Sequence, residues 1–139
     1  ALRLGGIYGP GRTRSIRRVL SGEARCPGPE EYGNRIHRDD AAGAALHLLG
    51  LPDPDAVYLG VDRDPASLRE VYRWVAERAG VPDPCRDEDD AETWEAPGRR
   101  GTSKRCSSDR LVASGYDFRW PTFREGYAPL IEELVAQRS

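Results

Sequence analysis

The 139-residue sequence has no methionine and only one lysine, and it is poor in large aliphatic side chains. Val, Ile, Leu and Phe together make up only 26 of the 139 residues, which is close to the level at which a chain cannot fill a core. A disordered chain also has a high net charge as a rule, and the net charge here is only −2. The sequence therefore predicts a lean folded domain, or a part of a larger one.

Several classes of protein are disfavoured by what the sequence lacks. It has no apolar run close to the roughly 20 residues of a membrane span, and no signal peptide is visible. A nucleic-acid-binding protein would carry a clear excess of basic residues. The three cysteines, Cys26, Cys85 and Cys106, form no C-x-x-C pair. We therefore expect a cytoplasmic protein with reduced thiols, and because the chain begins within an apolar run we expect a fragment.

Apolar runs, capping residues and glycines predict the elements. Strands are expected over residues 2–8 and 57–61, with a short extended piece at 34–37. Helices are expected over residues 16–20, 41–49, 68–79 and 109–113, and a last helix should follow Thr122. Asp39 or Asp40 should cap the helix over residues 41–49, and Ser67 with Glu70 should form a capping box.

Two further expectations concern the second half of the chain. Pro129 should kink or restart the last helix, because its ring clashes with the preceding turn. Residues 82–102 combine an acidic run with prolines and glycines, and we expect them to form a mobile loop.

Three short motifs have both a chemical and an ordinary structural interpretation. The Gly9–Gly11 turn follows a strand, as a dinucleotide-binding loop does, but position 14 is arginine rather than the third glycine. We favour a plain tight turn. The four arginines of the Arg12–Arg18 segment could grip phosphate groups, although a solvated helix face is the simpler interpretation. His37 beside Asp39 and Asp40 is a weak metal motif, and we predict no metal site.

Three segments, in order and correctly spaced, resemble the extended short-chain dehydrogenase/reductases, the NAD-dependent epimerase/dehydratase group. Residues 2–11 (LRLGGIYGPG) are similar to the L-R-x-x-N-V-Y-G-P segment of that family. Residues 35–42 (RIHRDDAA) resemble its I-H-V-D-D-x-A segment. Residues 104–127 resemble its closing K-x-x-x-x-x-L-x-x-L-G-Y and E-G-Y patterns. The resemblance covers nearly the whole chain.

The resemblance implies an α/β fold, with residues 1–139 forming the C-terminal part of a doubly wound Rossmann-type sheet plus a small substrate-binding lobe. It implies NAD or NADP as cofactor and a small hydroxyl or carbonyl substrate, such as a sugar, for oxidoreduction or epimerisation. The N-terminal half of the family supplies a Gly-rich loop and a Tyr-x-x-x-Lys pair, and this sequence contains neither. We therefore expect the chain alone to be inactive, with no catalytic residue, and to need that half as its partner.

The same resemblance suggests which residues face the ligands. The cofactor side of the cleft is expected at Leu4, Gly5 and Gly6, through backbone and close approach. The substrate is expected to meet Tyr8, Arg12 and Arg35.

Two departures from the family pattern bear on the substrate. Relatives that bind nucleotide-sugars usually have Asn at the position of Gly6, and they often have Arg at that of Gly33. Their loss argues against an ordinary nucleotide-diphosphate-sugar. Arg35 could replace the lost anion contact, or it could instead form a salt bridge with Asp39 or Asp40.

Other functions stay open at this stage. The chain could be a non-catalytic remnant that binds a partner protein, or a homodimer. A nucleic-acid-binding module using the Arg12–Arg18 segment is a further alternative.

Overall fold

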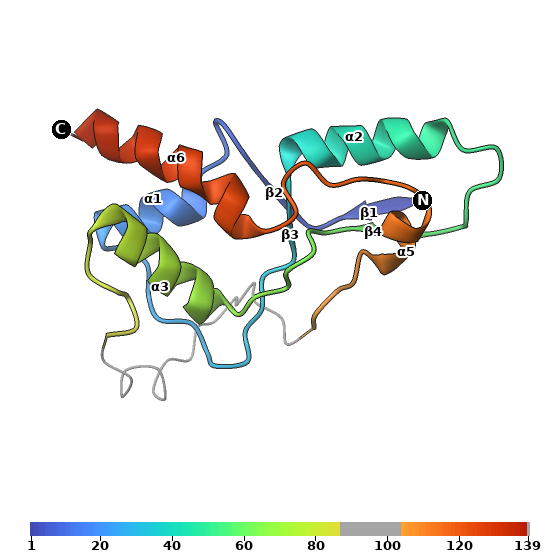
Figure 1. Cartoon of the computed structure of the whole chain (residues 1–139). Helices are drawn as coiled ribbons and strands as arrows, with labels where there is room; N and C mark the ends of the chain where they lie inside the picture. The colour runs from blue at the N-terminus through green and yellow to red at the C-terminus, as the bar shows by residue number, and fades with distance from the viewer. Residues whose placement is uncertain (87–103, 139) are drawn as a thin grey trace.

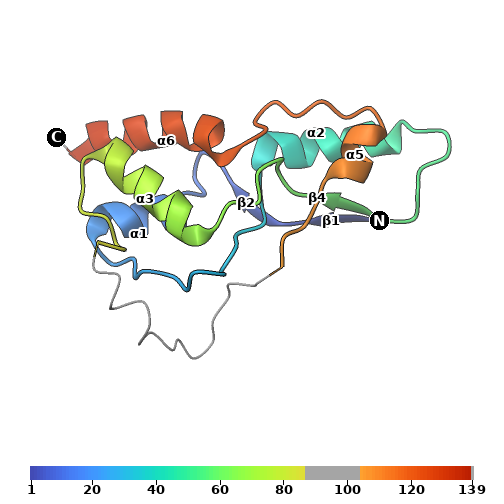
Figure 2. The same ribbon diagram turned by 60° about the horizontal axis from the view of Figure 1, so that its bottom comes forward.

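Three helices lie together at one end of the molecule, and a small sheet with two helices occupies the other end (Figure 1). The structure is a computed structural model that describes residues 1–86 and 104–138. The three-helix end consists of α1 (Arg14–Ser21), α3 (Leu68–Ala79) and α6 (Phe123–Arg138). The sheet end consists of β1 (Leu2–Leu4), β4 (Tyr58–Gly60), α2 (Arg38–Leu49) and α5 (Asp109–Ala113). Between them lie β2 (Gly6–Tyr8) and β3 (Arg35–His37). The N-terminus lies at the sheet end and the C-terminus at the far tip of α6 (Figures 1 and 2).

The predicted strand over residues 2–8 is wrong in one respect, because it is two strands with different partners. Strand β1 pairs in parallel with β4, and β2 pairs in parallel with β3. The exchange occurs at Gly5, whose N–H donates to the carbonyl of Gly60, while the N–H of Gly6 donates to Asn34. A Cβ added at Gly5 would lie 2.5 Å from the carbonyl oxygen of Asn34, so only glycine lets the two backbones approach this closely.

The local helix signals are mostly confirmed. Helix α3 begins after Ser67, whose Oγ accepts a hydrogen bond from the N–H of Glu70. Helices α1 and α3 end at glycines in the left-handed conformation, Gly22 and Gly80, as expected for C-terminal caps. Helix α6 is a single element that passes through Pro129, so the predicted restart is wrong.

The predicted cap of α2 is also wrong. The helix begins earlier, at Arg38, and its N-cap is His37 rather than Asp39 or Asp40. The Nδ1 atom of His37 accepts from the N–H of Asp39 at 3.0 Å. The imidazole therefore takes the place of the expected carboxylate, while Asp40 is buried inside the first turn.

The apolar core lies at the three-helix end. Helices α1, α3 and α6 pack through side chains that are almost wholly buried, among them Ile16, Val71, Val75, Phe123 and Ile131. Among the described residues, the sheet end has a small cluster around Ala44, Tyr58 and Leu111. The limited supply of aliphatic side chains is thus concentrated at one end.

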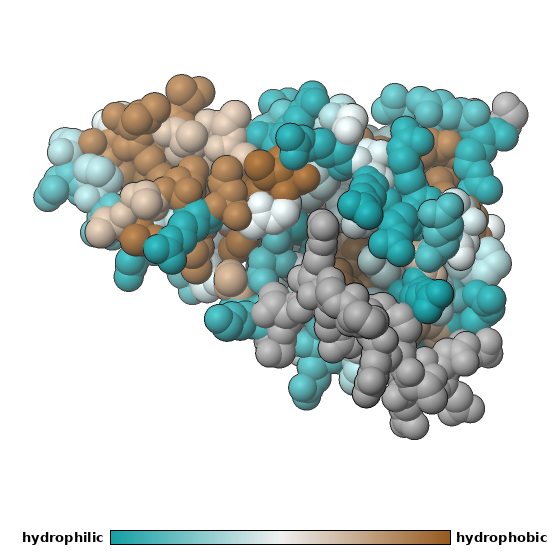
Figure 3. All heavy atoms as spheres, turned by 180° about the vertical axis from the view of Figure 1, so that it is seen from behind, coloured by the Kyte–Doolittle hydropathy of each residue, from teal (hydrophilic) through white to brown (hydrophobic). Residues whose placement is uncertain are grey.

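The sheet end presents an exposed apolar face. Figure 3 shows hydrophobic residues gathered over α2 and the two strands β1 and β4. We call Leu4, Leu46 and Leu49 the sheet-end face; their exposed fractions are 43%, 72% and 83%. Doubly wound sheets bury both faces, so this exposure agrees with the prediction that the strands belong to a larger sheet.

A disulfide between Cys26 and Cys85 joins the loop after α1 to the segment after α3. The expectation of three reduced thiols is therefore wrong for these two cysteines, and only Cys106 is a free thiol. The two are 59 residues apart, and α1 packs against α3, so only the tertiary fold brings them together.

Two sequence predictions, on membrane spans and on the loop over residues 82–102, can be compared only with the described residues. Within the described ranges, none of the helices has both the length and the apolar character to cross a membrane. Most of the loop predicted over residues 82–102 lies outside the described residues.

Candidate functional site

A cavity of about 560 Å3 lies between the β2–β3 pair, the start of α1 and the helices α3 and α6. Its volume is within the range of about 300–1,000 Å3 that is typical of small-molecule sites. Four of the six residues predicted to face cofactor or substrate line it, namely Gly6, Tyr8, Arg12 and Arg35. The other two lie elsewhere, because Leu4 is on the sheet-end face and Gly5 packs against the backbone of Asn34.

The parallel pairing of β2 and β3 sets the floor of this cavity. Gly6 is the register partner of Arg35, and Tyr8 is the register partner of His37. Alternate residues of a strand share one face, so Gly6 and Tyr8 lie on the same side of the pair as Arg35. Among the described residues, a Cβ added at Gly6 would have only the carbonyl oxygen of Asn34 within 4 Å, at 3.7 Å. The space above Gly6 is therefore open.

Arg35 is buried in this cavity without a hydrogen-bond partner for its terminal nitrogens. The side chain is 6% exposed, and neither Nη1 nor Nη2 has a partner within the described part of the chain. Its guanidinium carbon lies 5.6 Å from the ring centre of Phe123, close enough for a cation–π contact.

The alternative salt bridge of Arg35 with Asp39 or Asp40 does not form. Asp40 is fully buried, and its oxygens accept from the hydroxyl of Tyr116 and from the backbone N–H groups of Arg119 and Trp120, at 2.7–2.9 Å. Asp39 is near His37 and Arg38 instead. The carboxylates beside Arg35 in sequence are thus occupied by other groups.

Tyr8 provides a second buried polar group. Its ring meets His37 and Tyr127 edge-on, with centroids 5.2 Å and 4.7 Å away. Among the described residues its hydroxyl has no hydrogen-bond partner. Burial raises the pKa of Tyr8 far above its ordinary value, so the phenol keeps its proton. The hydroxyl lies against Gly126 of α6, where an added Cβ would collide with it.

Asp62 is a buried acid whose backbone is hydrogen-bonded to that of Arg35. Its N–H donates to the carbonyl oxygen of Arg35 at 2.6 Å. Burial raises the pKa of Asp62 to about 7, and the positive charge of Arg35 opposes that rise. The carboxyl is therefore only partly ionised at neutral pH and balances Arg35 incompletely.

Comparisons with known proteins bear on what this cavity belongs to. No protein-family profile and no curated protein matches the sequence, whereas several solved structures do. A protein from Methylobacillus flagellatus, described as an NAD-dependent epimerase/dehydratase, is 33% identical over 99% of the chain, with a TM-score of 0.71. A functionally unknown protein from Silicibacter pomeroyi is 30% identical over 96% of the chain, with a TM-score of 0.73. MoeE5, solved in complex with UDP-glucuronic acid and NAD, is 26% identical over 99%, with a TM-score of 0.67.

The chain belongs to the NAD-dependent epimerase/dehydratase family. It matches the C-terminal half of the fold, and it spans about half the length of these relatives, 47% of the first two and 46% of the third. The α/β prediction and the predicted resemblance are both confirmed.

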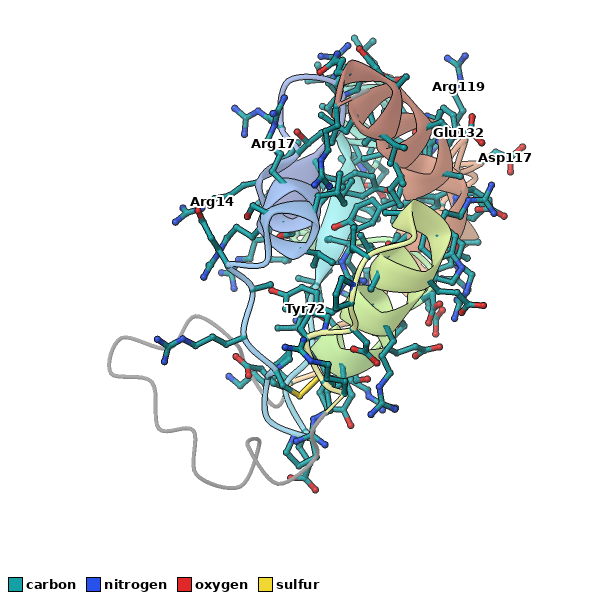
Figure 4. All side chains as sticks on the ribbon, turned by 90° about the vertical axis from the view of Figure 1, so that its left-hand side faces the viewer. Arg14, Arg17, Tyr72, Asp117, Arg119 and Glu132 are labelled. Carbon is teal, nitrogen blue, oxygen red and sulfur yellow. A yellow bond between two sulfur atoms is a disulfide. The ribbon has the colours of Figure 1, made fainter. Side chains whose placement is uncertain are left out.

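Asn34 and Tyr72 are among the cavity-lining residues of this epimerase/dehydratase chain that the sequence did not point to. Asn34 donates from Nδ2 to the carbonyl oxygen of Lys104 and accepts from the N–H of Cys106, so it holds the segment after the undescribed residues against β3. Tyr72 belongs to α3, and Figure 4 shows it between α1 and α3. Its position depends on helix packing, which no local pattern reports.

The arginine segment of this family member lies mostly in solvent. Arg12 closes a tight turn with Gly9 through two backbone hydrogen bonds, which confirms the turn predicted at residues 9–11. Arg14 and Arg17 extend away from α1 (Figure 4). Arg17 donates to Thr13. A second, open cavity of about 760 Å3 runs along these arginines and shares Arg12 and Arg14 with the first.

The residues considered as metal ligands have other roles. His37 caps α2 and stacks on Trp120, with ring centroids 4.9 Å apart, and burial lowers the pKa of His37. Residues 1–86 and 104–138 hold no cluster of three or more side chains suited to bind a metal ion.

Proposed function

We propose that this chain is the substrate-binding portion of an NAD(P)-dependent oxidoreductase or epimerase that acts on a small hydroxyl or carbonyl compound. One observation carries the proposal. Tyr8 and Arg35 both line this cavity, and the hydroxyl of Tyr8 and the terminal nitrogens of Arg35 are buried without hydrogen-bond partners within the described part of the chain. Buried polar groups are normally hydrogen-bonded, so these two are available to a ligand.

The proposed cofactor is NAD or NADP, with Leu4, Gly5 and Gly6 as its neighbours on this chain. The relatives support a nicotinamide cofactor, since one is described as NAD-dependent and another was solved with NAD. Leu4 is exposed and Gly6 has open space above it, so these residues fit one wall of such a site. When bound, the nicotinamide supplies the hydride chemistry, and Tyr8 and Arg35 bind and orient the substrate.

The proposed partner of the chain is the N-terminal half of the family fold. The sheet-end face supports this, because it exposes Leu46 and Leu49 beside two strands that pair only with each other among the described residues. A non-catalytic, protein-binding role is favoured by the same face and remains the second candidate function.

The cofactor part of the proposal is tested by fluorescence titration with NADH and NADPH. The sequence lacks the Gly-rich phosphate loop and the Tyr-x-x-x-Lys pair, so we expect no tight binding by this chain alone. A dissociation constant in the low micromolar range would contradict the proposal that the cofactor is held mainly by another half.

A chimera tests the positive side. Joined to the N-terminal half of the Methylobacillus flagellatus relative, the chain should bind NADH or NADPH. Tyr8→Phe should then leave cofactor affinity unchanged and lower kcat/KM for substrates that the chimera turns over. A non-catalytic remnant would bind the N-terminal half and show no turnover with any hydroxyl or carbonyl substrate.

A further inference from the structure

The guanidinium of Arg35 has a combination of burial and unsatisfied donors that calls for a ligand. An arginine side chain carries five N–H donors and keeps its charge at all accessible pH values. Burying such a group unpaired is costly, and removal from water is compensated only by hydrogen bonds and an opposite charge. Both terminal nitrogens lack a partner in residues 1–86 and 104–138, although the side chain is 6% exposed and lines the cavity.

The surroundings of Arg35 indicate the charge of that ligand. Among the described residues, no carboxylate lies within ion-pair distance of Arg35, and Asp40 is occupied by three other donors. Asp62 is close along the backbone pairing, but it accepts from the N–H of Asp64 and forms no ion pair with Arg35. Arg35 therefore carries a fixed positive charge with no ion-pair partner among the described residues, and the nearby carboxyl of Asp62 balances that charge only in part.

The geometry of that charge favours a carboxylate. The two terminal nitrogens of arginine form a planar fork that matches the two oxygens of a carboxylate. A phosphate dianion needs a second cation for neutralisation, and the other arginines of the cavity, Arg12 and Arg14, are exposed residues near the start of α1. Gly6 is the register partner of Arg35 and has open space above it among the described residues, which leaves room for a ligand beside Arg35.

We propose that this cavity binds a small hydroxylated carboxylic acid, such as a sugar acid, with its carboxylate on Arg35. The proposal deepens the proposed function, on which it rests for the hydroxyl or carbonyl group of the substrate. It names the substrate class as an acid rather than a neutral sugar or a nucleotide-diphosphate-sugar.

Gly33 offers a way to move the guanidinium without removing its charge. A Cβ added at Gly33 would collide with Nη2 of Arg35 and come within 3.0 Å of its Cζ. The other close atom is Cδ2 of Leu68, at 2.9 Å. Both are the ends of flexible side chains, so Gly33→Ala should leave the fold intact while it displaces the guanidinium.

The test is isothermal titration calorimetry on the full 139-residue chain without nicotinamide. The probes are lactate, galacturonate, the neutral galactose and galactose 1-phosphate. We expect both acids to bind, with galacturonate at least about tenfold tighter than galactose, since tenfold is the effect of one good interaction. Arg35→Gln and Gly33→Ala should each weaken the acids by about tenfold or more and leave galactose unaffected. Arg17→Gln, at an exposed arginine outside this cavity, is the matched control and should change nothing.

Several outcomes would overturn the proposal. They are no binding of either acid, equal binding of galactose and galacturonate, or tighter binding of galactose 1-phosphate than of galacturonate. Acid binding that is unchanged in Gly33→Ala, with an unchanged circular dichroism spectrum, would also overturn the proposal. If Arg35→Gln does not fold, the result with Gly33→Ala alone decides whether Arg35 binds the acid. The acid titrations contain no cofactor, so their outcome does not depend on that of the NADH and NADPH titrations. Failure of the acid proposal and failure of the cofactor proposal can therefore be told apart.

Discussion

Asp62 and Arg35 are oppositely charged residues that are joined by a backbone hydrogen bond, and both are buried. Asp62 is 3% exposed, and one of its carboxyl oxygens has no hydrogen-bond partner among the described residues. Burial raises the pKa of Asp62 from 3.8 to about 7. The folded chain therefore holds this proton more tightly than the unfolded chain does.

This difference predicts how stability depends on pH. Well below pH 3.8 the carboxyl is protonated in both states and does not change the free energy of unfolding. As the pH rises towards 7, the unfolded chain ionises while the folded chain does not, so the free energy of unfolding falls. At 1.36 kcal/mol per pKa unit the loss is at most about 4 kcal/mol. Urea unfolding at pH 5 and pH 7.5 should show this fall, and Asp62→Asn should remove most of it and be more stable at pH 7.5.

The control for this prediction is Asp109→Asn. Asp109 is exposed, and a hydrogen bond from Arg63 lowers the pKa of Asp109, so it titrates below the window tested. Parallel loss of stability in wild type and Asp62→Asn between pH 5 and 7.5 would show that another group causes the dependence.

At the scale of single residues, the sequence predicted several residues that line the cavity, but it did not predict whether Arg35 forms an ion pair. Family segments pointed to Gly6, Tyr8, Arg12 and Arg35, which line one cavity. The sequence could not show whether Arg35 pairs with Asp40, because that depends on which groups donate hydrogen bonds to the Asp40 carboxylate. Those donors, at Tyr116, Arg119 and Trp120, are 76–80 residues away.

Among the elements, α3 has a cap whose contribution can be measured. Ser67 accepts from the N–H of Glu70 at 3.2 Å, and α3 packs against both α1 and α6. Ser67→Ala should lower the free energy of unfolding by about 1 kcal/mol, the usual loss for an N-cap. Ser15→Ala, at an exposed serine inside α1, is the control and should change it by less than about 0.5 kcal/mol. Equal effects of the two substitutions would mean that Ser67 does not act as a cap.

Elements defined by local chemistry were predicted, and those defined by distant partners were not. Capping serines, terminal glycines and apolar periodicity predicted the bounds of α3 and α5, those of α1 to within two residues, and the start of α6 after Thr122. The division of residues 2–8 at Gly5 depends on β3 and β4, which follow about 30 and 53 residues later. The cap of α2 depends on the rotamer of His37, which no propensity reports.

For the whole molecule, the sheet-end face predicts self-association. Burial of apolar surface contributes about 25 cal/mol per Å2, and parallel strands with open edges invite pairing with another chain. We expect the isolated chain to be weakly folded or to associate with a second copy as its concentration rises. Analytical ultracentrifugation and thermal melts over a range of concentrations measure this.

A double substitution locates the contact. Leu46→Gln with Leu49→Gln keeps good helix formers in α2 and should reduce the association. Arg14→Gln with Arg17→Gln, at exposed positions on α1 at the other end, should not. A sharp, concentration-independent melt from a strictly monomeric wild-type sample would show that the chain is a complete domain.

The bond between Cys26 and Cys85 makes part of the backbone a closed ring that contains β3, α2, β4 and α3. All three Asp–Pro peptide bonds of the sequence lie inside it, at residues 53–54, 64–65 and 83–84. Dilute acid cleaves Asp–Pro bonds in preference to others. A single cut therefore opens the ring without releasing a fragment, and the molecule gains only the mass of one water. Two fragments should separate on a gel after a reductant is added, whereas their separation without reductant would mean that the two thiols are not joined.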